Sequence, residues 1–364
     1  MTLRPAERSI LLLALVGDQA AQQAARSLPL VRVRWQVLLD AALPTRVAAF
    51  LDRLVSEAGL ALGPVAAPLR EEAERVAAQA AMTVHAAGRA QACLAAAGVR
   101  SLAVKGVAFQ AHAPAHLARR HLDDVDLLVR PGDLARAATA LSGAGFEPDD
   151  LLPDYRGAAL DGASAQPALH RTANFLGPGR TLVELHTVMP ACRGPEASFE
   201  ALLARSVTAR QGGATLAVPG LDDTLGLLCR HVVVQHAAEA GHLPRHVADV
   251  AALLRAGASP EAAAARFDGD GRASVAWSLA LLDAARRGTG RAARAWSPLW
   301  GPLDRLRVRL VEYRGAAGSG ALGMLFPSRR YMAQRYGASA GSPLLPLLYL
   351  WRPLRGVVKL VLGR

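Results

Sequence analysis

The spacing of apolar residues changes along the chain, and each change indicates a different kind of structure. From residue 1 to about residue 100, apolar residues recur at the three- and four-residue spacing of helices, and alanine is frequent. Residues 71–97 predict one long helix, and Gly98 follows it in the manner of a C-terminal glycine. The first hundred residues are therefore predicted to be a helical region.

Short apolar or alternating runs replace the helical pattern at Ser101. Alternation with a period of two is typical of strands, and Gly177-Pro178-Gly179 between two such runs predicts a hairpin. The predicted strands are residues 101–104, 123–129, 170–176 and 181–187, with a brief edge strand at 146–148, and the predicted helices among them are 107–113 and 134–141.

Beyond Pro190 the pattern is mostly helical again. Helices are predicted from Leu221 through His231 and over residues 243–254, followed by further helices with glycine-rich breaks. The pattern thus divides the chain into an N-terminal helical region (1–100), a strand-rich unit (101–190) and a C-terminal helical domain with a basic apolar tail (191–364).

Composition favours a folded globular protein, because 52% of the 364 residues are hydrophobic and only 20% are charged. The net charge of +12 would suit an anionic partner, but the arginines are dispersed and lysine occurs only at Lys105 and Lys359, so a general coding bias explains most of the charge. The three cysteines have no zinc-type spacing, which fits reduced thiols in a cytoplasmic protein.

Both ends carry apolar runs that need an interpretation. Residues 9–17 resemble a signal-peptide core but lack a clean cleavage site, so a buried first helix is favoured. Residues 344–362 contain Arg352, Arg355 and Lys359, so no transmembrane span is expected there. This tail is either a helix docked on the body, which we favour, or a basic segment in peripheral contact with a membrane.

The strongest chemical signal is the pair Asp124 and Asp126 in the predicted strand. Alternate side chains of a strand share a face, so both carboxylates point the same way while Val125 and Leu127 point into the core. Two carboxylates on one face repel each other and are costly to bury unless a cation joins them. Mg²⁺ suits such hard oxygen ligands, and the pair therefore predicts an enzyme.

Two further features can meet this pair in space. Glu184 and His186 share one face of the second hairpin strand. Lys105-Gly106 lies where the first strand passes into a helix, whose unpaired N–H groups and positive dipole end form a phosphate site. Gly106 permits close approach of a phosphate, and Lys105 can add a positive charge.

These motifs together resemble the nucleotidyltransferase superfamily built on the DNA polymerase β palm, and more narrowly the bacterial uncharacterised nucleotidyltransferase family proteins. The matching segments are Leu102-Ala103-Val104-Lys105-Gly106, Arg120-x-x-x-Asp124-Val125-Asp126-Leu127-Leu128-Val129, Ala144-Gly145-Phe146, Val183-Glu184-Leu185-His186, Arg245-His246-Val247-Ala248-Asp249-Val250 and Phe326 to Met332. The resemblance implies an α+β nucleotidyltransferase fold, with a small mixed-sheet palm flanked by N-terminal and C-terminal helical regions.

The resemblance also implies an activity: transfer of a nucleoside monophosphate from a nucleoside triphosphate such as ATP to a hydroxyl or phosphate acceptor, with release of pyrophosphate. Asp124 and Asp126 match the metal ligands, and Glu184 matches the third carboxylate, so two Mg²⁺ ions are expected. Lys105-Gly106 stands where the wider superfamily has Gly-Ser, so Lys105 and the helix N-terminus are expected to take over triphosphate binding.

Several other residues can be interpreted either as functional or as purely structural. Arg120 either binds triphosphate or pairs with a metal-site aspartate, and His186 either serves the site or is a structural histidine. Arg245 and Asp249 either belong to the nucleotide site or form an internal pair four residues apart on one helix. Asp123 faces away from its neighbours and is expected to be a bystander.

The acceptor stays open between a small molecule, a natural product, a peptide and an RNA. A toxin-like enzyme that adds nucleotides to tRNA is one alternative, which the basic charge permits. A non-catalytic nucleotide sensor that keeps the fold is another, and the intact set of three carboxylates argues against it.

Overall fold

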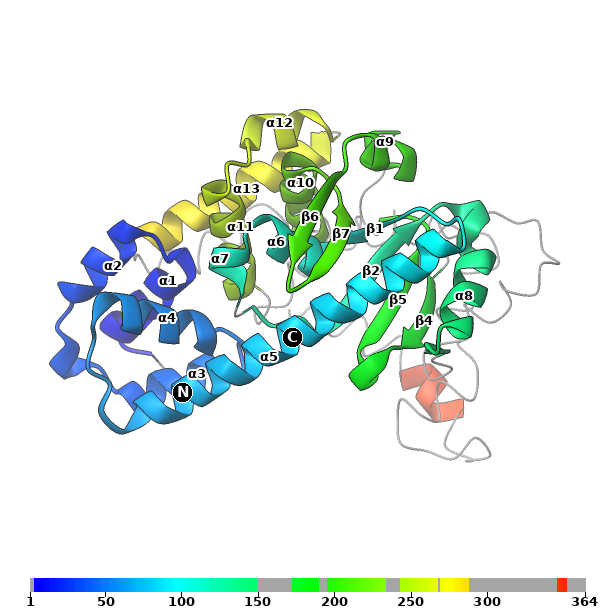
Figure 1. The fold of residues 1–364 in the computed structure, drawn as a ribbon. Helices are drawn as coiled ribbons and strands as arrows, with labels where there is room; N and C mark the ends of the chain where they lie inside the picture. The colour runs from blue at the N-terminus through cyan, green and yellow to red at the C-terminus, as the bar shows by residue number, and fades with distance from the viewer. Residues whose placement is uncertain are drawn as a thin grey trace.

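The fold is described from a computed structural model, which places residues 3–118, 120–148, 172–189, 195–233, 243–267, 269–287 and 346–351. The N-terminal helices lie beside α11 and α13, which follow much later in the chain, and a mixed β-sheet lies beyond them along one long helix (Figure 1). Within the described residues no helix is both long and apolar enough to cross a bilayer.

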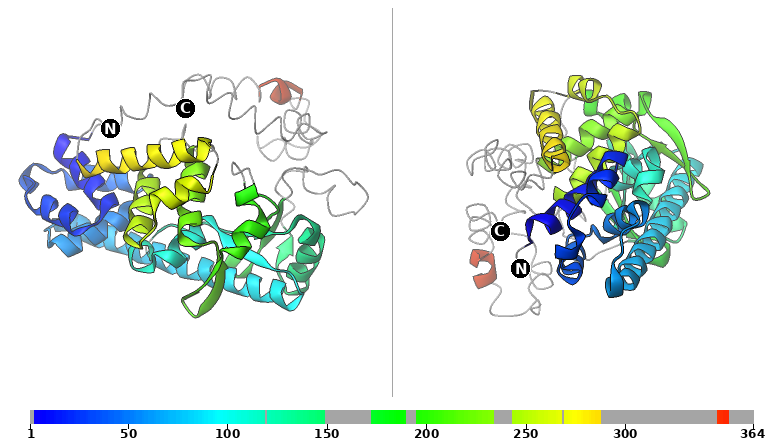
Figure 2. Two further views of the ribbon diagram at one scale, coloured as in Figure 1. Left: turned by 90° about the horizontal axis from the view of Figure 1, so that it is seen from above. Right: turned by 90° about the vertical axis from the view of Figure 1, so that its left-hand side faces the viewer.

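Four helices open the chain and form a core with helices that follow much later in the sequence. Helix α1 is buried through Ile10, Ala14, Leu15 and Val16, as expected for the first apolar run. It packs against α11 and α13 (Figure 2). The opening helices are α1 (Pro5–Val16), α2 (Gln19–Arg26), α3 (Trp35–Ala42) and α4 (Ala48–Ala58), with short 3₁₀ turns at Leu30–Arg32 and Gly63–Val65.

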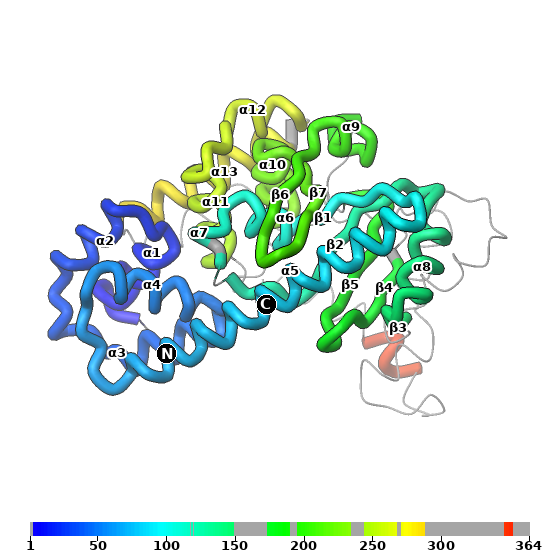
Figure 3. Tube along the Cα trace, in the orientation of Figure 1, coloured from blue at the N-terminus to red at the C-terminus, as the bar shows by residue number. Residues whose placement is uncertain are grey.

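Helix α5 (Ala66–Ala96) connects this helical core to the sheet. Its first half packs on α4, and its second half packs on the strands β1 and β2 and on helix α8 (Figure 3). Gly98 follows with a positive φ of 69°, a conformation that glycine adopts without a steric penalty. The long helix predicted over 71–97 is confirmed, and it begins about a turn earlier.

The central sheet has five strands in the order β1-β2-β5-β4-β3. Strands β2 and β5 are parallel, whereas the other neighbours are antiparallel, so the sheet is mixed as expected. The predicted hairpin is β4 with β5, and the brief edge strand is β3. The strands are β1 (Ser101–Val104), β2 (Asp124–Val129), β3 (Glu147–Pro148), β4 (Thr172–Leu176) and β5 (Leu182–His186).

The two faces of the sheet carry different residues because side chains alternate along each strand. One face presents Val125, Leu127, Val183 and Leu185 to the buried side chains of α5 and α8. The opposite face is apolar at one side, where Leu102, Val104 and Leu128 pack against Phe199 and Leu227. The same face also carries Asp124, Asp126, Glu184, His186 and Asn174, with Leu182 and Leu176 beside them. The connecting helices are α6 (Lys105–His112), α7 (Pro114–Leu117) and α8 (Leu134–Gly143), with 3₁₀ turns at Pro131–Asp133 and Pro178–Arg180.

The chain beyond Pro190 contains a β-hairpin that the helical interpretation of this region missed. Strands β6 (Val207–Gln211) and β7 (Ala214–Val218) pair in antiparallel fashion around Gly212 and Gly213, both at positive φ. A two-glycine turn is a hairpin signature, because it matches the twist of the flanking strands. The Gln91 side chain of α5 donates to the backbone carbonyls of Ser101 in β1 and Ala217 in β7, and its carbonyl accepts from the Ala217 N–H. One buried amide thus ties both sheets to α5.

The remaining helices confirm the other elements predicted for this region. The helices predicted from Leu221 and over 243–254 are α10 and α11. The C-terminal helices are α9 (Phe199–Ala204), α10 (Leu221–His231), α11 (Leu243–Arg255), α12 (Pro260–Ala265) and α13 (Gly269–Arg286), with a 3₁₀ turn at Pro195–Ala197.

Of the tail over 344–362, only residues 346–351 lie within the described part of the chain. They are helical, with Leu347, Leu350 and Trp351 exposed. Docking of the tail and its membrane contact both stay predictions, as does the division of the chain into three regions.

A buried ion pair joins the loop before β2 to helix α11. Arg120 donates from Nε and Nη2 to the two carboxylate oxygens of Asp249 in α11, at 2.7 and 2.9 Å. Its Nη1 donates to the His121 carbonyl, and its guanidinium lies 5.4 Å from the ring centroid of Phe109. Both charged side chains are almost fully buried, so each depends on the other for its stability.

We predict that Asp249→Ala destabilises the protein by about 3–5 kcal/mol, because it leaves the Arg120 guanidinium buried without its counter-charge. Urea unfolding followed by circular dichroism measures the change. The matched control is the double variant Arg120→Met with Asp249→Leu, which removes both charges and should cost much less. Equal losses in the single and double variants would show that the ion pair is not what fixes this contact.

Candidate functional site

The polar residues of the sheet's second face lie in one row across three strands. Asp126 in β2 is the register partner of Glu184 in the parallel strand β5, and Glu184 is the partner of Asn174 in β4. On the other side, Asp126 pairs with Val104 at the end of β1. Register partners in adjacent strands have Cβ atoms about 5 Å apart, so this pairing brings the carboxylates together.

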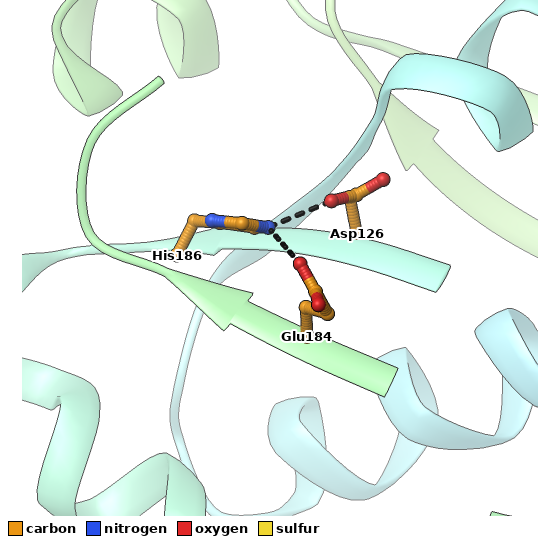
Figure 4. Close-up of side chains that lie close together, drawn as sticks. All are labelled: Asp126, Glu184 and His186. Carbon is orange, nitrogen blue, oxygen red and sulfur yellow. Dashed lines mark hydrogen bonds and ion pairs between the residues drawn. The ribbon is translucent and has the colours of Figure 1, made fainter. Parts of the chain in front are cut away.

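The carboxylates of Asp126 and Glu184 both contact the Nε2 atom of His186 (Figure 4). The His186 Nε2 atom lies 2.7 Å from Asp126 Oδ1 and 3.3 Å from Glu184 Oε2. One ligand atom from each of the three residues lies within 4.8 Å of the others. His186 therefore belongs to the site and bridges its two carboxylates.

Lys105 reaches the same carboxylate from the end of β1. It is the first residue of α6 and adopts a positive φ of 52°, which is uncommon for a residue with a side chain. Its Nζ donates to Asp126 Oδ1 at 2.5 Å. The side chain of Lys105 is 18% exposed and that of Asp126 only 2%, so this ion pair lies largely away from solvent.

The charge state of this cluster follows from burial and from these contacts. Burial alone raises the pKa of the Asp126 carboxyl, but the charge of Lys105 and the hydrogen bond from His186 outweigh it and hold that pKa well below its usual range. Burial lowers the pKa of His186, but its hydrogen bonds to Asp126 and Glu184 raise it above its usual value. The cluster therefore favours an ionised Asp126 beside a protonated His186.

The pKa of Asp124 shifts in the opposite direction from that of Asp126. Burial first, and then the charge of Asp126, raise its pKa to about 7. Asp124 lies on the same face of β2 as Asp126, two residues earlier, where β2 begins. Its carboxylate is therefore the one whose charge is least compensated by the protein's own side chains.

The donor set at this face fits a divalent cation. Asp126 and Glu184 offer carboxylate oxygens, which hard ions such as Mg²⁺ prefer, and Asp124 adds a carboxylate with too little compensating charge. One buried oxygen of the row, Asn174 Oδ1, lacks a hydrogen-bond partner among the described residues. Such an atom is costly to bury, and a group bound at this face would satisfy it.

Asn174 is the member of this row that sequence reasoning did not select. It is 6% exposed, and its Nδ2 lies 3.4 Å from Glu184 Oε1, a long hydrogen bond. The alternation of the predicted hairpin strand already allowed it to share a face with Glu184. Which residue lies opposite Glu184 depends on the strand register, which the alternation alone does not specify.

Gly106, the second residue of α6, packs against the loop that precedes β2. Gly106 lies under two side chains: a Cβ atom there would be 2.8 Å from Leu122 Cδ2 and 2.9 Å from Arg120 Nη1. Its lack of a side chain therefore serves this packing. A role for Gly106 in phosphate approach stays a prediction.

Arg120, Asp249 and Arg245 have contacts of their own, outside the carboxylate row. The Arg120–Asp249 ion pair described above, rather than a pair with a metal-site aspartate, satisfies both residues. Arg245 Nη1 lies 4.0 Å from Asp123 Oδ2, and Arg46 also pairs with Asp123. Asp123 is thus a half-exposed partner of arginines. Roles for Arg120, Arg245 and Asp249 in nucleotide binding stay predictions.

Some residues considered from the sequence lie outside the described part of the chain. They are Cys192 and the segment from Phe326 to Met332.

Comparison with known families agrees with this geometry. The family model described as "Uncharacterised nucleotidyltransferase" matches residues 32–270, which include Lys105, Asp124, Asp126, Glu184 and His186. The family predicted from the sequence is therefore confirmed, and the five-stranded mixed sheet is consistent with a nucleotidyltransferase fold. No curated protein matches the chain.

We predict that Asp124→Asn stabilises the metal-free protein at alkaline pH. The pKa of Asp124 rises from about 3.8 to about 7 in the fold, so the stability that its neutral form contributes is lost as the pH rises through this range. The variant avoids that loss. It should match the wild type near pH 4 and exceed it at pH 8 by up to about 4 kcal/mol, since each pH unit corresponds to about 1.4 kcal/mol.

Urea unfolding in EDTA at both pH values measures this difference. Asp123→Asn is the matched control, because it removes the exposed neighbouring carboxylate and should shift stability little at either pH. A difference between wild type and Asp124→Asn that is the same at pH 4 and pH 8 would refute the interpretation.

Proposed function

Because the chain belongs to the uncharacterised nucleotidyltransferase family, we propose that it transfers a nucleoside monophosphate from a nucleoside triphosphate to a hydroxyl or phosphate acceptor, with release of pyrophosphate. The observation that carries this proposal is the register of β2 against β5, which sets Glu184 beside Asp126 on the face that Asp124 also shares. Three carboxylates on one face are the donor set that this chemistry needs.

Asp124, Asp126 and Glu184 would hold the divalent metal, for which Mg²⁺ is the expected ion and two ions the expected number. When bound, the metal supplies charge neutralisation for the attacking and leaving oxygens of phosphoryl transfer. Burial of Asp126 strengthens its electrostatic interactions, because the local dielectric constant is lower than that of water. His186 orients Asp126 and Glu184 by contacting both.

Phosphate binding would fall to Lys105 and the N-terminus of α6. The ammonium lies at the edge of the carboxylate row, and the first N–H groups of the helix begin at the same position. A lysine supplies a point charge on a flexible stem, whereas a serine supplies one short hydroxyl. The lysine can therefore serve a triphosphate that sits farther from the backbone than one held by a serine.

Glu184 would also accept the proton of the attacking hydroxyl. Burial raises its pKa, but the hydrogen bond from His186 and other nearby positive charge leave that pKa below its usual value, so the group is an ionised acceptor at neutral pH. The acceptor would be a small molecule, a natural product or a peptide.

We predict that the double variant Asp124→Ala with Asp126→Ala loses transfer activity by at least about a thousandfold, because it removes the charges that hold the metal. Release of pyrophosphate from a nucleoside triphosphate in the presence of Mg²⁺ and acceptor measures the rate. Asp123→Ala, which changes the outward-facing neighbour, should retain most of the activity. Activity that survives in the double variant would exclude this mechanism.

Incubation of the protein with labelled nucleoside triphosphates and cell extract should identify the acceptor class. A labelled small product or peptide supports the proposal, and a labelled tRNA band would favour the toxin-like alternative. Labelling that is absent with all four nucleotides, together with nucleotide binding, would indicate a sensor instead of an enzyme. The double variant serves as the control for label that other enzymes in the extract transfer.

A further inference from the structure

The oxygen of Asp126 that faces the cluster already accepts two hydrogen bonds. Lys105 Nζ and His186 Nε2 both donate to Oδ1, at 2.5 and 2.7 Å. A carboxylate oxygen accepts through two lone-pair sites in its plane, so both sites of Oδ1 are taken. A cation that binds through this oxygen therefore has to replace one of the two donors.

The two donors differ in how easily they can leave. The His186 side chain is 4% exposed, belongs to the last residue of the middle strand β5, and also contacts Glu184. The Lys105 side chain is 18% exposed, and a four-carbon stem with free rotation carries its ammonium. Lys105 is therefore the donor that can move without disturbing a strand.

Lys105 also supplies one positive charge at the place where a divalent ion would supply two. Its ammonium interacts with Asp126 first, and the charges of Asp124 and Glu184 act on it as well, so all three carboxylates favour the same cation. A positive φ is unfavourable for a residue with a side chain, so the fold holds Lys105 in place against a local penalty.

We propose that Lys105 is a built-in cation of the carboxylate site, which occupies the place beside Asp126 in the metal-free protein and is displaced from it when a divalent ion binds. This inference rests on the proposed function, because it concerns the metal site of that reaction. Lysine and metal then compete for Asp126. The released ammonium becomes free to meet the phosphates of the nucleotide, so the metal would bind weakly until a nucleotide offers the ammonium a second anion.

The first test compares Mn²⁺ binding to the wild type, Lys105→Met and Lys359→Met by electron paramagnetic resonance, with no nucleotide present. Methionine keeps an unbranched, flexible side chain that is one atom shorter, and it removes the charge. Because the competing cation is gone, Lys105→Met should bind Mn²⁺ at least about tenfold more tightly, which corresponds to about 1.4 kcal/mol. Lys359→Met removes the other of the two lysines and should bind as the wild type does.

The second test follows the ammonium itself in the unmodified protein. Labelling with ¹⁵N at the lysine Nζ gives only two signals, and Lys105→Met assigns them. We expect Mg²⁺ to shift the Lys105 signal and to leave the Lys359 signal in place. If Lys105→Met does not fold, Lys359→Met gives the assignment by removing the other signal, and the wild-type spectrum decides the question.

The outcomes separate this inference from the proposed function. Equal or weaker Mn²⁺ binding by Lys105→Met, or a Lys105 signal that Mg²⁺ does not shift, overturns the displacement and leaves nucleotidyl transfer intact. Such a result would mean that the ion uses the other oxygen of Asp126 while the ion pair stays. If neither the wild type nor Lys105→Met binds Mn²⁺ without nucleotide, the inference is refuted, because removal of the competing ammonium should have opened the site. The metal-dependent function is refuted as well only if neither protein binds Mn²⁺ when a nucleoside triphosphate is present.

Discussion

Negative charge buried on one sheet face is the constraint on which the rest of the site depends. The parallel pairing of β2 with β5 sets Asp126 beside Glu184, with Asp124 on the same face. Carboxylates removed from water need compensating positive charge. Lys105 and His186 provide this positive charge for Asp126. The charge of Asp124 is not fully compensated, and its pKa is therefore raised to about 7. The site is therefore stable without a metal and still prepared to receive one.

The scaffold holds this face from behind and from the side. Helix α5 packs on the apolar face of the sheet, and Gln91 in that helix satisfies backbone groups of both β1 and β7. The Arg120–Asp249 pair anchors the chain just before β2 to helix α11. Since Gly106 packs directly against Arg120 and Leu122, the turn that carries Lys105 is held by the same contact. The position of Lys105 over the carboxylates thus depends on residues far along the chain.

Sequence patterns correctly predicted the helices and strands whose signal lies within one short segment of the chain. The strands at Ser101 and Asp124, the hairpin of β4 and β5, and the helices α5, α8, α10 and α11 follow from periodicity and from glycine and proline placement. The hairpin of β6 and β7 was missed although Gly212-Gly213 is a turn signature, because a neighbouring helical pattern was extended across it. The pairing of Arg120 with Asp249, 129 residues apart, has no local signal at all.

The sequence by itself determined which residue types carry the chemistry and which face of its own strand each one occupies, since alternation is a property of the strand. It therefore supplied Asp124 with Asp126, Glu184 with His186, and Lys105 at a strand-to-helix turn. Only the tertiary structure decided how these sets meet. The parallel register of β2 and β5 placed Asp126 opposite Glu184, and the antiparallel register of β4 and β5 brought Asn174 into the row. The tertiary structure also decided the contact of Lys105 with Asp126. A one-residue slip in strand pairing would have turned the strand side chains of this site to the other face of the sheet.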